Sequence, residues 1–299
     1  MRSQTRRASV CLAILLSAFP AGAQEEQRVD LHGFGSWAYG KTDANAYLSG
    51  LPEGSYSDSS FSLNVSTNVS ERLRIASQME VLDKADDSFI ELDYAFAEWR
   101  FSDRIRLRAG KVKQPFGVST EVFDVGTLRP FLALPQAVYG PVGIVAEAFG
   151  GIGFTGSVPL IHSWRLSYDV YGGGMVLNEF QTPEAFFEGE PLLGVEENTT
   201  RDVIGGRIVV ETPVAGLSVG ASAYTGTEVG HGRRSAAGAQ AEYLTDKWSA
   251  RTEYTHDAIE DHRRADGFYA EVAYRIDPRW QVAGQYGRLT SDLLAGRHT

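Results

Sequence analysis

The chain has 299 residues, with 28 Lys and Arg against 38 Asp and Glu, so its formal net charge is −10. This acidic balance argues against a nucleic-acid-binding protein, because such proteins carry a basic face for phosphate. A single Cys excludes a disulfide framework and a cysteine-based zinc site. No run of 18 apolar residues follows the N-terminus, so a helical membrane protein is excluded. A soluble protein or a transmembrane β-barrel remains.

The N-terminus has the pattern of an export signal. Three arginines lie among the first seven residues, and the mostly apolar stretch 8–19 is too short to span a bilayer. The small-x-small triplet at 21–23 fits a cleavage site. We therefore expect residues 1–23 to be a cleaved signal peptide and residues 24–299 to form one barrel domain. Removing three arginines leaves 25 basic against 38 acidic residues, a net charge of −13.

The mature chain shows the period-two alternation of β-strands. Phe61, Leu63 and Val65 share one parity, while Ser62 and Asn64 share the other. No long segment has helical periodicity, so we expect an all-β fold. Thirteen strands are predicted, at 29–39, 60–69, 73–81, 90–97, 105–109, 143–158, 164–172, 203–211, 217–225, 236–244, 248–255, 267–276 and 280–289.

The connections between these predicted strands alternate in length. The long ones are 40–59, 83–88, 112–142, 173–202, 226–235 and 256–266. The short ones are 70–71, 102–103, 159–163, 212–216, 245–247 and 277–279. Outer-membrane barrels have long extracellular loops and short periplasmic turns, whereas a soluble sandwich has no reason to keep this alternation.

The aromatic residues favour the same architecture. A Trp stands just after three of the short turns, and a Tyr follows six or seven residues later: Trp164 and Tyr171, Trp248 and Tyr254, Trp280 and Tyr286. Such pairs are typical of the two aromatic girdles of a membrane-spanning strand. The sequence therefore predicts a transmembrane antiparallel β-barrel.

The connection 112–142 is too apolar for a free surface loop. It contains four of the eleven Pro residues and several Phe, Leu and Val residues, so we expect it to pack against another part of the chain. In a barrel the available place is the lumen. Folded inward, the loop would narrow the pore and bring Glu121, Asp124 and Arg129 near the opposite wall.

A resemblance to a known family rests on residues 107–117, which read LRAGKVKQPFG. They resemble the LRxGKxKxPFG signature of the phosphate-selective porin O/P superfamily. The opening LHGFGSWAYG at 31–40 and the Pro-rich third loop fit in the same order. The resemblance implies a sixteen-stranded, trimeric porin whose third loop folds into the channel. Three strands would then be absent at the C-terminus, leaving an open edge between 29–39 and 280–289.

We expect the chain to act as an outer-membrane porin through which small hydrophilic solutes or anions diffuse passively, without catalysis or a cofactor. The expected pore-lining basic residues are Arg72, Arg74, Arg104, Arg106, Arg108, Lys111 and Lys113. The expected constriction residues are Pro115, Phe116, Gly117, Glu121, Asp124 and Arg129. Acidic residues, among them Glu80, Glu91 and Asp93, would oppose the basic side across the lumen. At physiological salt the Debye length is about 8 Å, so local basic charges should outweigh acidic loops and give a mild anion preference.

Two other readings stay open, a structural or adhesive barrel with a plugged lumen and a soluble periplasmic β protein. The expected partners are outer-membrane lipid, lipopolysaccharide and two further copies of the chain in a homotrimer. An acidic loop that includes Glu188 could bridge lipopolysaccharide through divalent cations, although a solvated loop is the simpler interpretation.

Three apparent chemical motifs are weaker evidence for a function. Residues 151–156 read GIGFTG, but a dinucleotide site needs a helix after the glycines, and none is predicted. His256, Asp257, Asp261 and His262 have the residue types of a metal site, although a polar loop explains them as well. No Gly-x-Ser-x-Gly elbow or Ser-His-Asp order points to an enzyme.

Overall fold

In the computed structural model, residues 29–43, 50–84, 87–120, 129–131, 133–140, 143–180, 195–260 and 262–292 are described. They form one 14-stranded sheet and a single helical turn. The strands are β1 Val29–Lys41, β2 Gly50–Leu51, β3 Ser55–Asn68, β4 Leu73–Lys84, β5 Asp87–Ser102, β6 Ile105–Lys113, β7 Ala148–Pro159, β8 Arg165–Phe180, β9 Val195–Glu211, β10 Leu217–Glu228, β11 Gly232–Leu244, β12 Trp248–Ile259, β13 Arg263–Asp277 and β14 Trp280–Ser291. The helix is α1, Gln136–Tyr139.

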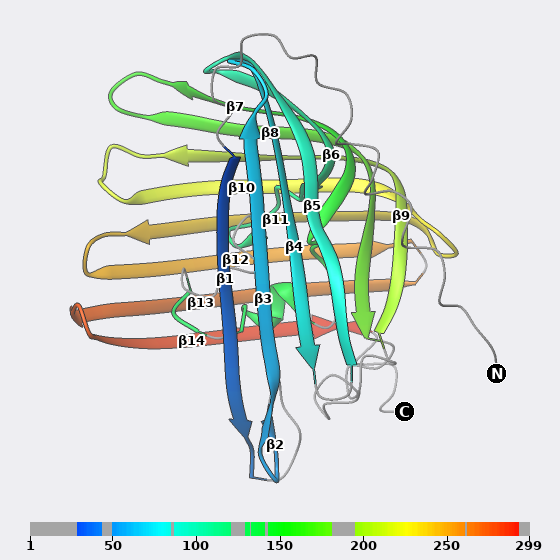
Figure 1. Cartoon of the computed structure of the whole chain (residues 1–299), viewed down its shortest axis with the longest axis vertical. Helices are drawn as coiled ribbons and strands as arrows, with labels where there is room; N and C mark the ends of the chain where they lie inside the picture. Colours follow the sequence, from blue (N-terminus) through cyan, green and yellow to red (C-terminus); the bar gives the residue numbers. More distant parts are fainter. Residues whose placement is uncertain are drawn as a thin grey trace.

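Successive long strands are antiparallel neighbours throughout the sheet, as expected of an up-and-down barrel (Figure 1). All thirteen predicted strands are present. The fourteenth, β2, is a two-residue segment within the predicted loop 40–59 that pairs in parallel with the end of β1. The sheet does not close within the described residues. Its edges are β14 and the β1–β2 pair, which is where the sequence predicts an open edge.

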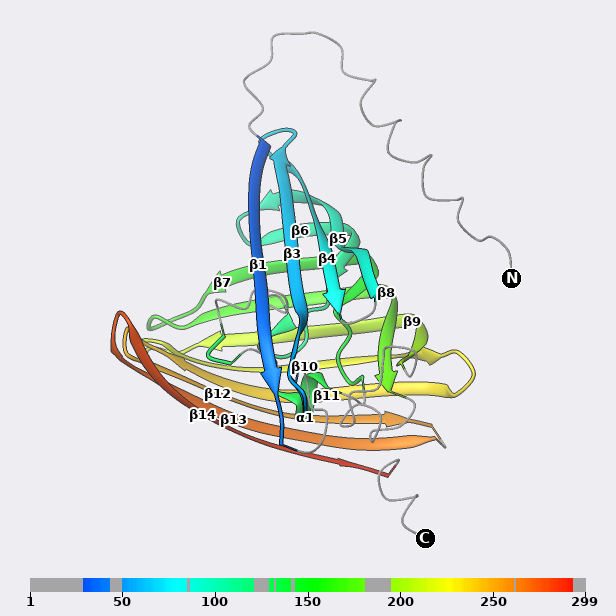
Figure 2. The same ribbon diagram turned by 60° about the horizontal axis from the view of Figure 1, so that its bottom comes forward.

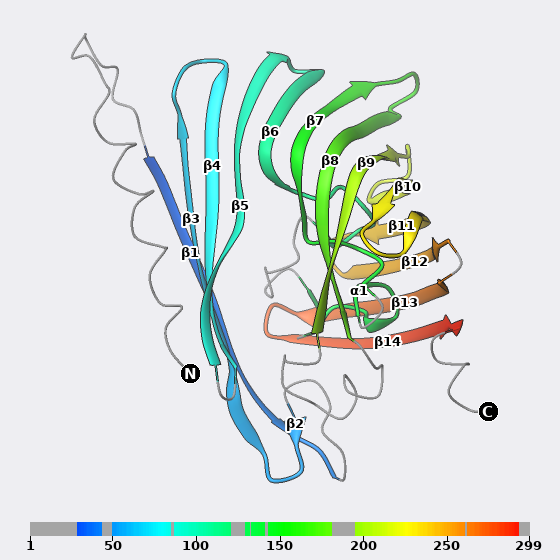
Figure 3. The ribbon, with the colours of Figure 1, turned by 90° about the vertical axis from the view of Figure 1, so that its right-hand side faces the viewer.

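The two faces of the sheet have the polarity expected of a membrane barrel. Phe61 and Ile75 are exposed on the convex face, whereas Ser62 and Gln78 are buried on the concave face. Figures 2 and 3 show the sheet curling about its concave side, where α1 lies. Apolar side chains therefore point outward and polar ones inward, as in a membrane barrel and in reverse of a soluble sandwich. Among the described residues, no helix has the length and apolarity needed to cross a membrane.

Several predicted long loops are too long. Strand β4 ends at Lys84 and β5 begins at Asp87, and β8 ends at Phe180 and β9 begins at Val195, so the predicted loops 83–88 and 173–202 are both shortened. Strands β10 and β11 continue to the pair Glu228–Gly232, and β12 and β13 continue to Ile259–Arg263, so only a few residues connect each pair. Inward charged side chains occupy these strand ends and form buried ion pairs, and such charges mask the apolar alternation on which the prediction relied. The predicted start of a strand at 143 is also wrong. Residues 143–147 belong to the loop, with Ile144 fully buried.

Two of the three predicted Trp–Tyr pairs lie on one face of the sheet, and the third does not. Trp248, Tyr254, Trp280 and Tyr286 are all exposed on the convex face. Tyr171 is buried on the concave face instead, with only 3% of its surface exposed. Since side chains alternate between faces, a spacing of six keeps Trp and Tyr on the same face and a spacing of seven separates them.

A row of three glycines crosses the sheet where it bends. Gly110, Gly151 and Gly173 pair in register on β6, β7 and β8. A Cβ atom added to any of them would lie 2.1–2.3 Å from a carbonyl oxygen of the neighbouring strand. The backbones approach too closely for a side chain here, so only glycine fits. The GIGFTG stretch is thus part of β7, and its glycines serve packing between strands.

Candidate channel face and inward loop

A group of paired charges lies on the concave face of β5 and β6. Glu98 accepts a hydrogen bond from Nε of Arg108 at 2.7 Å, and Arg106 lies 3.7 Å from the same carboxylate. Arg74 on β4 pairs with Glu98 in register. The guanidinium of Arg74 donates to Ser66 at 3.2 Å instead. One carboxylate thus faces two guanidinium groups, leaving one excess positive charge. The side chain of Arg106 remains 36% exposed, which keeps this charge in contact with solvent.

The two lysines of the signature are paired with acids on the neighbouring strand. Lys111 lies 3.8 Å from Glu91. Lys113 contacts Asp93 and lies 2.7 Å from Glu147 at the end of the inward loop. These acids neighbour the lysines because β5 and β6 are adjacent. The expected opposition of Glu91 and Asp93 to the basic side across the lumen is therefore wrong.

The predicted basic residues do not all lie on strands. Arg74, Arg106, Arg108, Lys111 and Lys113 do, but Arg72 and Arg104 lie in the exposed turns after β3 and β5. The backbone carbonyl of Arg104 accepts a hydrogen bond from Tyr168 at 3.0 Å. These two arginines therefore stand at one end of the sheet, beyond the run of the others.

Both ends of the inward loop, residues 114–147, contact one buried side-chain amide. Gln114 donates through Nε2 to the hydroxyl of Tyr171 at 2.9 Å, and its Oε1 accepts from the backbone N–H of Ala146 at 2.8 Å. Gln114 is fully buried. Because a buried amide must satisfy its donors and acceptors, this residue holds both ends of the loop against β8.

The next contacts hold the predicted constriction residues Phe116 and Gly117 on the wall. Phe116 is fully buried, with its ring edge toward Tyr224 at a centroid distance of 5.7 Å. The N–H of Gly117 donates to Ser222 at 3.0 Å, and its carbonyl accepts from Arg207 at 3.3 Å. Gly117 has φ of +67°, and an added Cβ would lie 2.1 Å from Oε1 of Glu253. The position therefore requires glycine.

The hydroxyl group of Tyr139 links two parts of the inward loop to β12. The hydroxyl of Tyr139 donates to Oε2 of Glu253 at 2.8 Å and accepts from the N–H groups of Val118 and Ser119 at 3.1 and 3.0 Å. Burial first, and then the Glu253 carboxylate, raise the pKa of Tyr139 well above its usual range. The tyrosine thus stays a neutral donor.

The far end of the loop rests on a buried charge network. Arg234 binds Glu228 at 2.7 Å and Asp257 at 2.9 Å, and its Nη2 donates to the carbonyl of Gly143 at 2.6 Å. Arg263 reaches the other oxygen of Asp257 at 2.6 Å. All four charged side chains are fully buried. The two positive and two negative groups neutralise one another, and buried charges need such pairing to offset the loss of their hydration.

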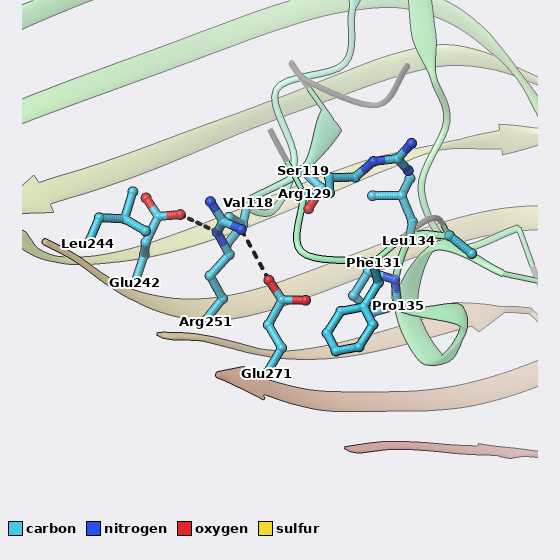
Figure 4. A pocket seen from close by; sticks show the side chains of 11 residues that line it. Val118, Ser119, Arg129, Phe131, Leu134, Pro135, Glu242, Leu244, Arg251 and Glu271 are labelled. Carbon is cyan, nitrogen blue, oxygen red and sulfur yellow. Dashed lines mark hydrogen bonds and ion pairs between the residues drawn. The ribbon is translucent and has the colours of Figure 1, made fainter. Parts of the chain in front are cut away.

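A cavity of about 310 Å³ lies between the inward loop and strands β11–β13 (Figure 4). Arg129 lines it, together with apolar residues of the loop. Pro115 is buried in the loop. Glu121 and Asp124 lie outside the described residues, so their predicted place near the opposite wall is untested.

Sequence reasoning placed the loop inward but missed its anchors. Gln114, Tyr139, Arg234 and Glu253 were not among the predicted site residues. Strand parity alone could have placed Arg234 and Glu253 on the concave face. Nothing local marks Gln114 or Tyr139 as an anchor, because each contacts strands more than 50 residues away.

The residues at 256–262 that have the types of a metal site do not gather where they are described, and Asp261 lies outside the described residues. His256 lies on the convex face against Asp266, at 2.9 Å, whereas the neighbouring Asp257 points into the buried network. His262 stacks on His231 instead, at a centroid distance of 4.1 Å. Within the described part of the chain, no three His, Cys, Asp or Glu residues are placed to hold a metal ion.

No protein family and no curated protein sequence matches the chain. Its fold is similar to the outer membrane channel DcaP of Acinetobacter baumannii, with a TM-score of 0.53 and 10% identity over 91% of this chain and 82% of that one. The outer membrane protein OmpT of Vibrio cholerae gives a TM-score of 0.43 at 11% identity, covering 89% of each chain. Salmonella typhi OmpF in complex with daunomycin gives 0.42 at 12% identity, over 87% of this chain and 90% of that one.

At these identities the similarity concerns the fold alone, and the two scores below 0.5 add no argument. The similarity to DcaP agrees with the antiparallel sheet of this chain. The chain therefore has the fold of an outer-membrane, porin-like β-barrel.

Proposed function

We propose that the chain forms a water-filled channel in the bacterial outer membrane, through which small hydrophilic solutes diffuse passively. The observation that carries this proposal is the reversed polarity of the sheet, with charged side chains gathered on the concave face beside an inward loop. Insertion of the purified protein into a planar bilayer tests it. Stepwise conductance supports a channel. Stable insertion without conductance supports the alternative, a structural or adhesive barrel with a plugged lumen.

Cysteine labelling tests which face of the sheet is in contact with water. Arg106 points to the concave face, and Leu107 on the same strand points to the convex face. Because the only Cys lies in the proposed signal peptide, single cysteines at these two positions can be labelled without background. We expect a membrane-impermeant thiol reagent to modify cysteine at 106 and to leave cysteine at 107 unmodified in lipid. The reverse result contradicts the proposed lumen.

A mild preference for anions is the finer part of this proposal. Its support is the pair of guanidinium groups of Arg106 and Arg108 beside the single carboxylate of Glu98. The lysines on the same strand add little, since acids of the neighbouring strand neutralise them. The reversal potential under a KCl gradient measures the preference, and clear cation selectivity would overturn it.

We also propose lipopolysaccharide as a neighbour of the convex face. Arg201 and Arg233 both pair with Thr227 and are exposed, so they lie two strand spacings apart, about 10 Å. Guanidinium groups are well suited to bind phosphate. Phosphate that copurifies with the protein should fall in the double variant Arg201→Gln/Arg233→Gln. Arg279→Gln, in the turn at the opposite end, is the control. Equal phosphate in both variants would count against this partner.

The homotrimer rests on the sequence resemblance alone. Chemical cross-linking in native membranes tests it, with bands up to three copies expected and a monomer-only pattern against it.

A further inference from the structure

The cavity between the inward loop and the wall has a charged side and an apolar side. Strands β11–β13 contribute three charged side chains, Glu242, Arg251 and Glu271. The loop side is mostly apolar and includes Val118, Phe131, Ala133, Leu134 and Pro135. At about 310 Å³ the cavity lies at the lower end of the range for small-molecule sites, which combine a mostly apolar lining with a few polar groups.

The wall side carries an excess of negative charge. Nε of Arg251 donates to Glu242 at 2.6 Å, and its Nη1 donates to Glu271 at 3.1 Å. Two carboxylates therefore share one guanidinium, which leaves a net charge of about −1. Water screens this charge poorly, because only 6% of the Glu271 side chain and 24% of the Glu242 side chain are exposed.

The arginine on the loop side does not offset this negative charge. Figure 4 shows the guanidinium of Arg129 pointing away from Glu242 and Glu271, and this arginine has a partner of its own. The ring of Phe131 lies across the cavity from the Glu271 carboxylate instead (Figure 4). A cation placed between a carboxylate and an aromatic ring is attracted by both.

The Glu271 carboxylate can accept a further donor. One of its oxygens accepts from Arg251, and the other accepts from Nε2 of Gln285 at 3.2 Å. An ionised carboxylate has about four acceptor sites, so two hydrogen bonds leave room for an ammonium group. The cavity thus presents an acceptor of excess negative charge, an aromatic ring and an apolar wall.

We propose that this cavity binds organic ammonium ions that carry a short apolar body, as in a phenylalkylamine. The ammonium group would lie between the carboxylate of Glu271 and the ring of Phe131, and the apolar body would contact Leu134. This inference rests on the proposed channel function, since it names a solute class that the channel would retain at its inward loop. A solute held there narrows the path beside the loop, so binding should reduce the current.

Four solutes separate the contributions of charge and apolar body. 2-Phenylethylammonium has both, whereas ethylammonium has the cation alone. 2-Phenylethanol is the neutral counterpart of nearly the same shape, and 3-phenylpropanoate carries the opposite charge. We expect 2-phenylethylammonium to reduce single-channel current at a concentration about tenfold lower than any of the other three, because each of them lacks the charge-assisted contact or the apolar one. Equal potency of 2-phenylethylammonium and either 2-phenylethanol or ethylammonium overturns the proposal.

Variants tie the effect to the cavity. Glu271→Gln should abolish the tenfold advantage of 2-phenylethylammonium over 2-phenylethanol, because it removes the excess negative charge and keeps the size of the side chain. Glu242→Gln should have the same effect and tests the more exposed of the two carboxylates. Glu211→Gln is the matched control and should keep the advantage, since Glu211 pairs with the exposed Arg165 outside the cavity. An advantage that survives both Glu271→Gln and Glu242→Gln rules out the assigned site.

Binding to the detergent-solubilised protein, measured by isothermal titration calorimetry, separates this inference from the channel proposal. Selective binding of 2-phenylethylammonium without conductance would overturn the channel and support the cavity. Conductance without selective binding would support the channel and overturn the assigned site.

Discussion

The charges beside β6 and those beneath the inward loop are the same residue types in opposite surroundings. Arg106 and Glu98 lie 3.7 Å apart, with the arginine one-third exposed. Arg234 and Asp257 lie 2.9 Å apart with neither exposed. A solvent-facing pair contributes little to stability and keeps its field available to passing ions. A buried pair favours one specific structure, and removing one partner leaves the other charge buried without a counter-charge. Selectivity and loop placement should therefore respond to different mutations.

Arg234→Ala should have the largest effect on stability. It leaves Glu228 and Asp257 buried without their guanidinium and removes the donor to Gly143, so we expect a loss of about 3–5 kcal/mol. Urea unfolding in detergent, followed by tryptophan fluorescence, measures it. Arg106→Ala is the control and should cost no more than about 1 kcal/mol. Similar losses in both variants would erase the distinction between the two regions.

Gly117→Ala should have the second-largest effect on stability. The new methyl group meets Glu253, and the positive φ disfavours any side chain, so we expect a cost of about 1–3 kcal/mol. The loop should move away from β10 and β12, which single-channel conductance and protease accessibility would report. Gly284→Ala on β14 is the matched control, since no atom lies within 4 Å of its added Cβ. Unchanged conductance in Gly117→Ala would mean that this contact does not set the position of the loop.

Tyr139→Phe should cost about 1–2 kcal/mol, because Glu253 and two backbone N–H groups lose their partner. The raised pKa of Tyr139 also predicts a pH dependence. Folding favours the neutral phenol, so its contribution is complete below the ordinary pKa of 10.0 and is lost as pH rises through the folded pKa. Unfolding at about pH 8 and about pH 11 should show a smaller decline in Tyr139→Phe than in the unmodified protein. An identical decline would assign the effect to other tyrosines.

Arg106→Glu should have the smallest effect on stability and a clear effect on selectivity. A unit charge 4 Å from a passing ion is worth about 1 kcal/mol in water, and this substitution changes the charge by two units, so we expect the Cl⁻/K⁺ permeability ratio to fall by at least about fivefold. Glu188→Lys, a change of equal charge in the acidic loop, should shift the reversal potential far less. A larger shift from Glu188→Lys would place the selective charges at the mouth.

The strands could be predicted because their pattern is local. Each face of β3 or β4 is readable from alternate residues, and thirteen predicted strands are present. The ends of β10–β13 could not be read in this way, because Glu228, Arg234, Asp257 and Arg263 make charged strand ends resemble loops. Only the pairing of these residues across four strands shows that they belong to the core.

The site was harder to predict than the fold, because its contacts are distant in sequence. The inward course of the loop follows from its apolar composition. Its anchors join Gly117 to Arg207 and Tyr139 to Glu253, which are 90 and 114 residues apart. No short pattern encodes such a pair. The signature residues Lys111 and Lys113 were recognisable as basic, but their neutralisation by β5 appears only once the strands are aligned.

The row formed by Gly110, Gly151 and Gly173 has a consequence for the width of the proposed channel. Strands that touch backbone to backbone can turn sharply, so curvature concentrates at β6–β8. The radius of a barrel depends on how steeply each strand turns from the next as well as on the number of strands. A single methyl group at Gly151 would push β7 and β8 apart and flatten this arc. The curvature of the sheet, and with it the width of the proposed channel, therefore depends partly on three positions that have no side chain.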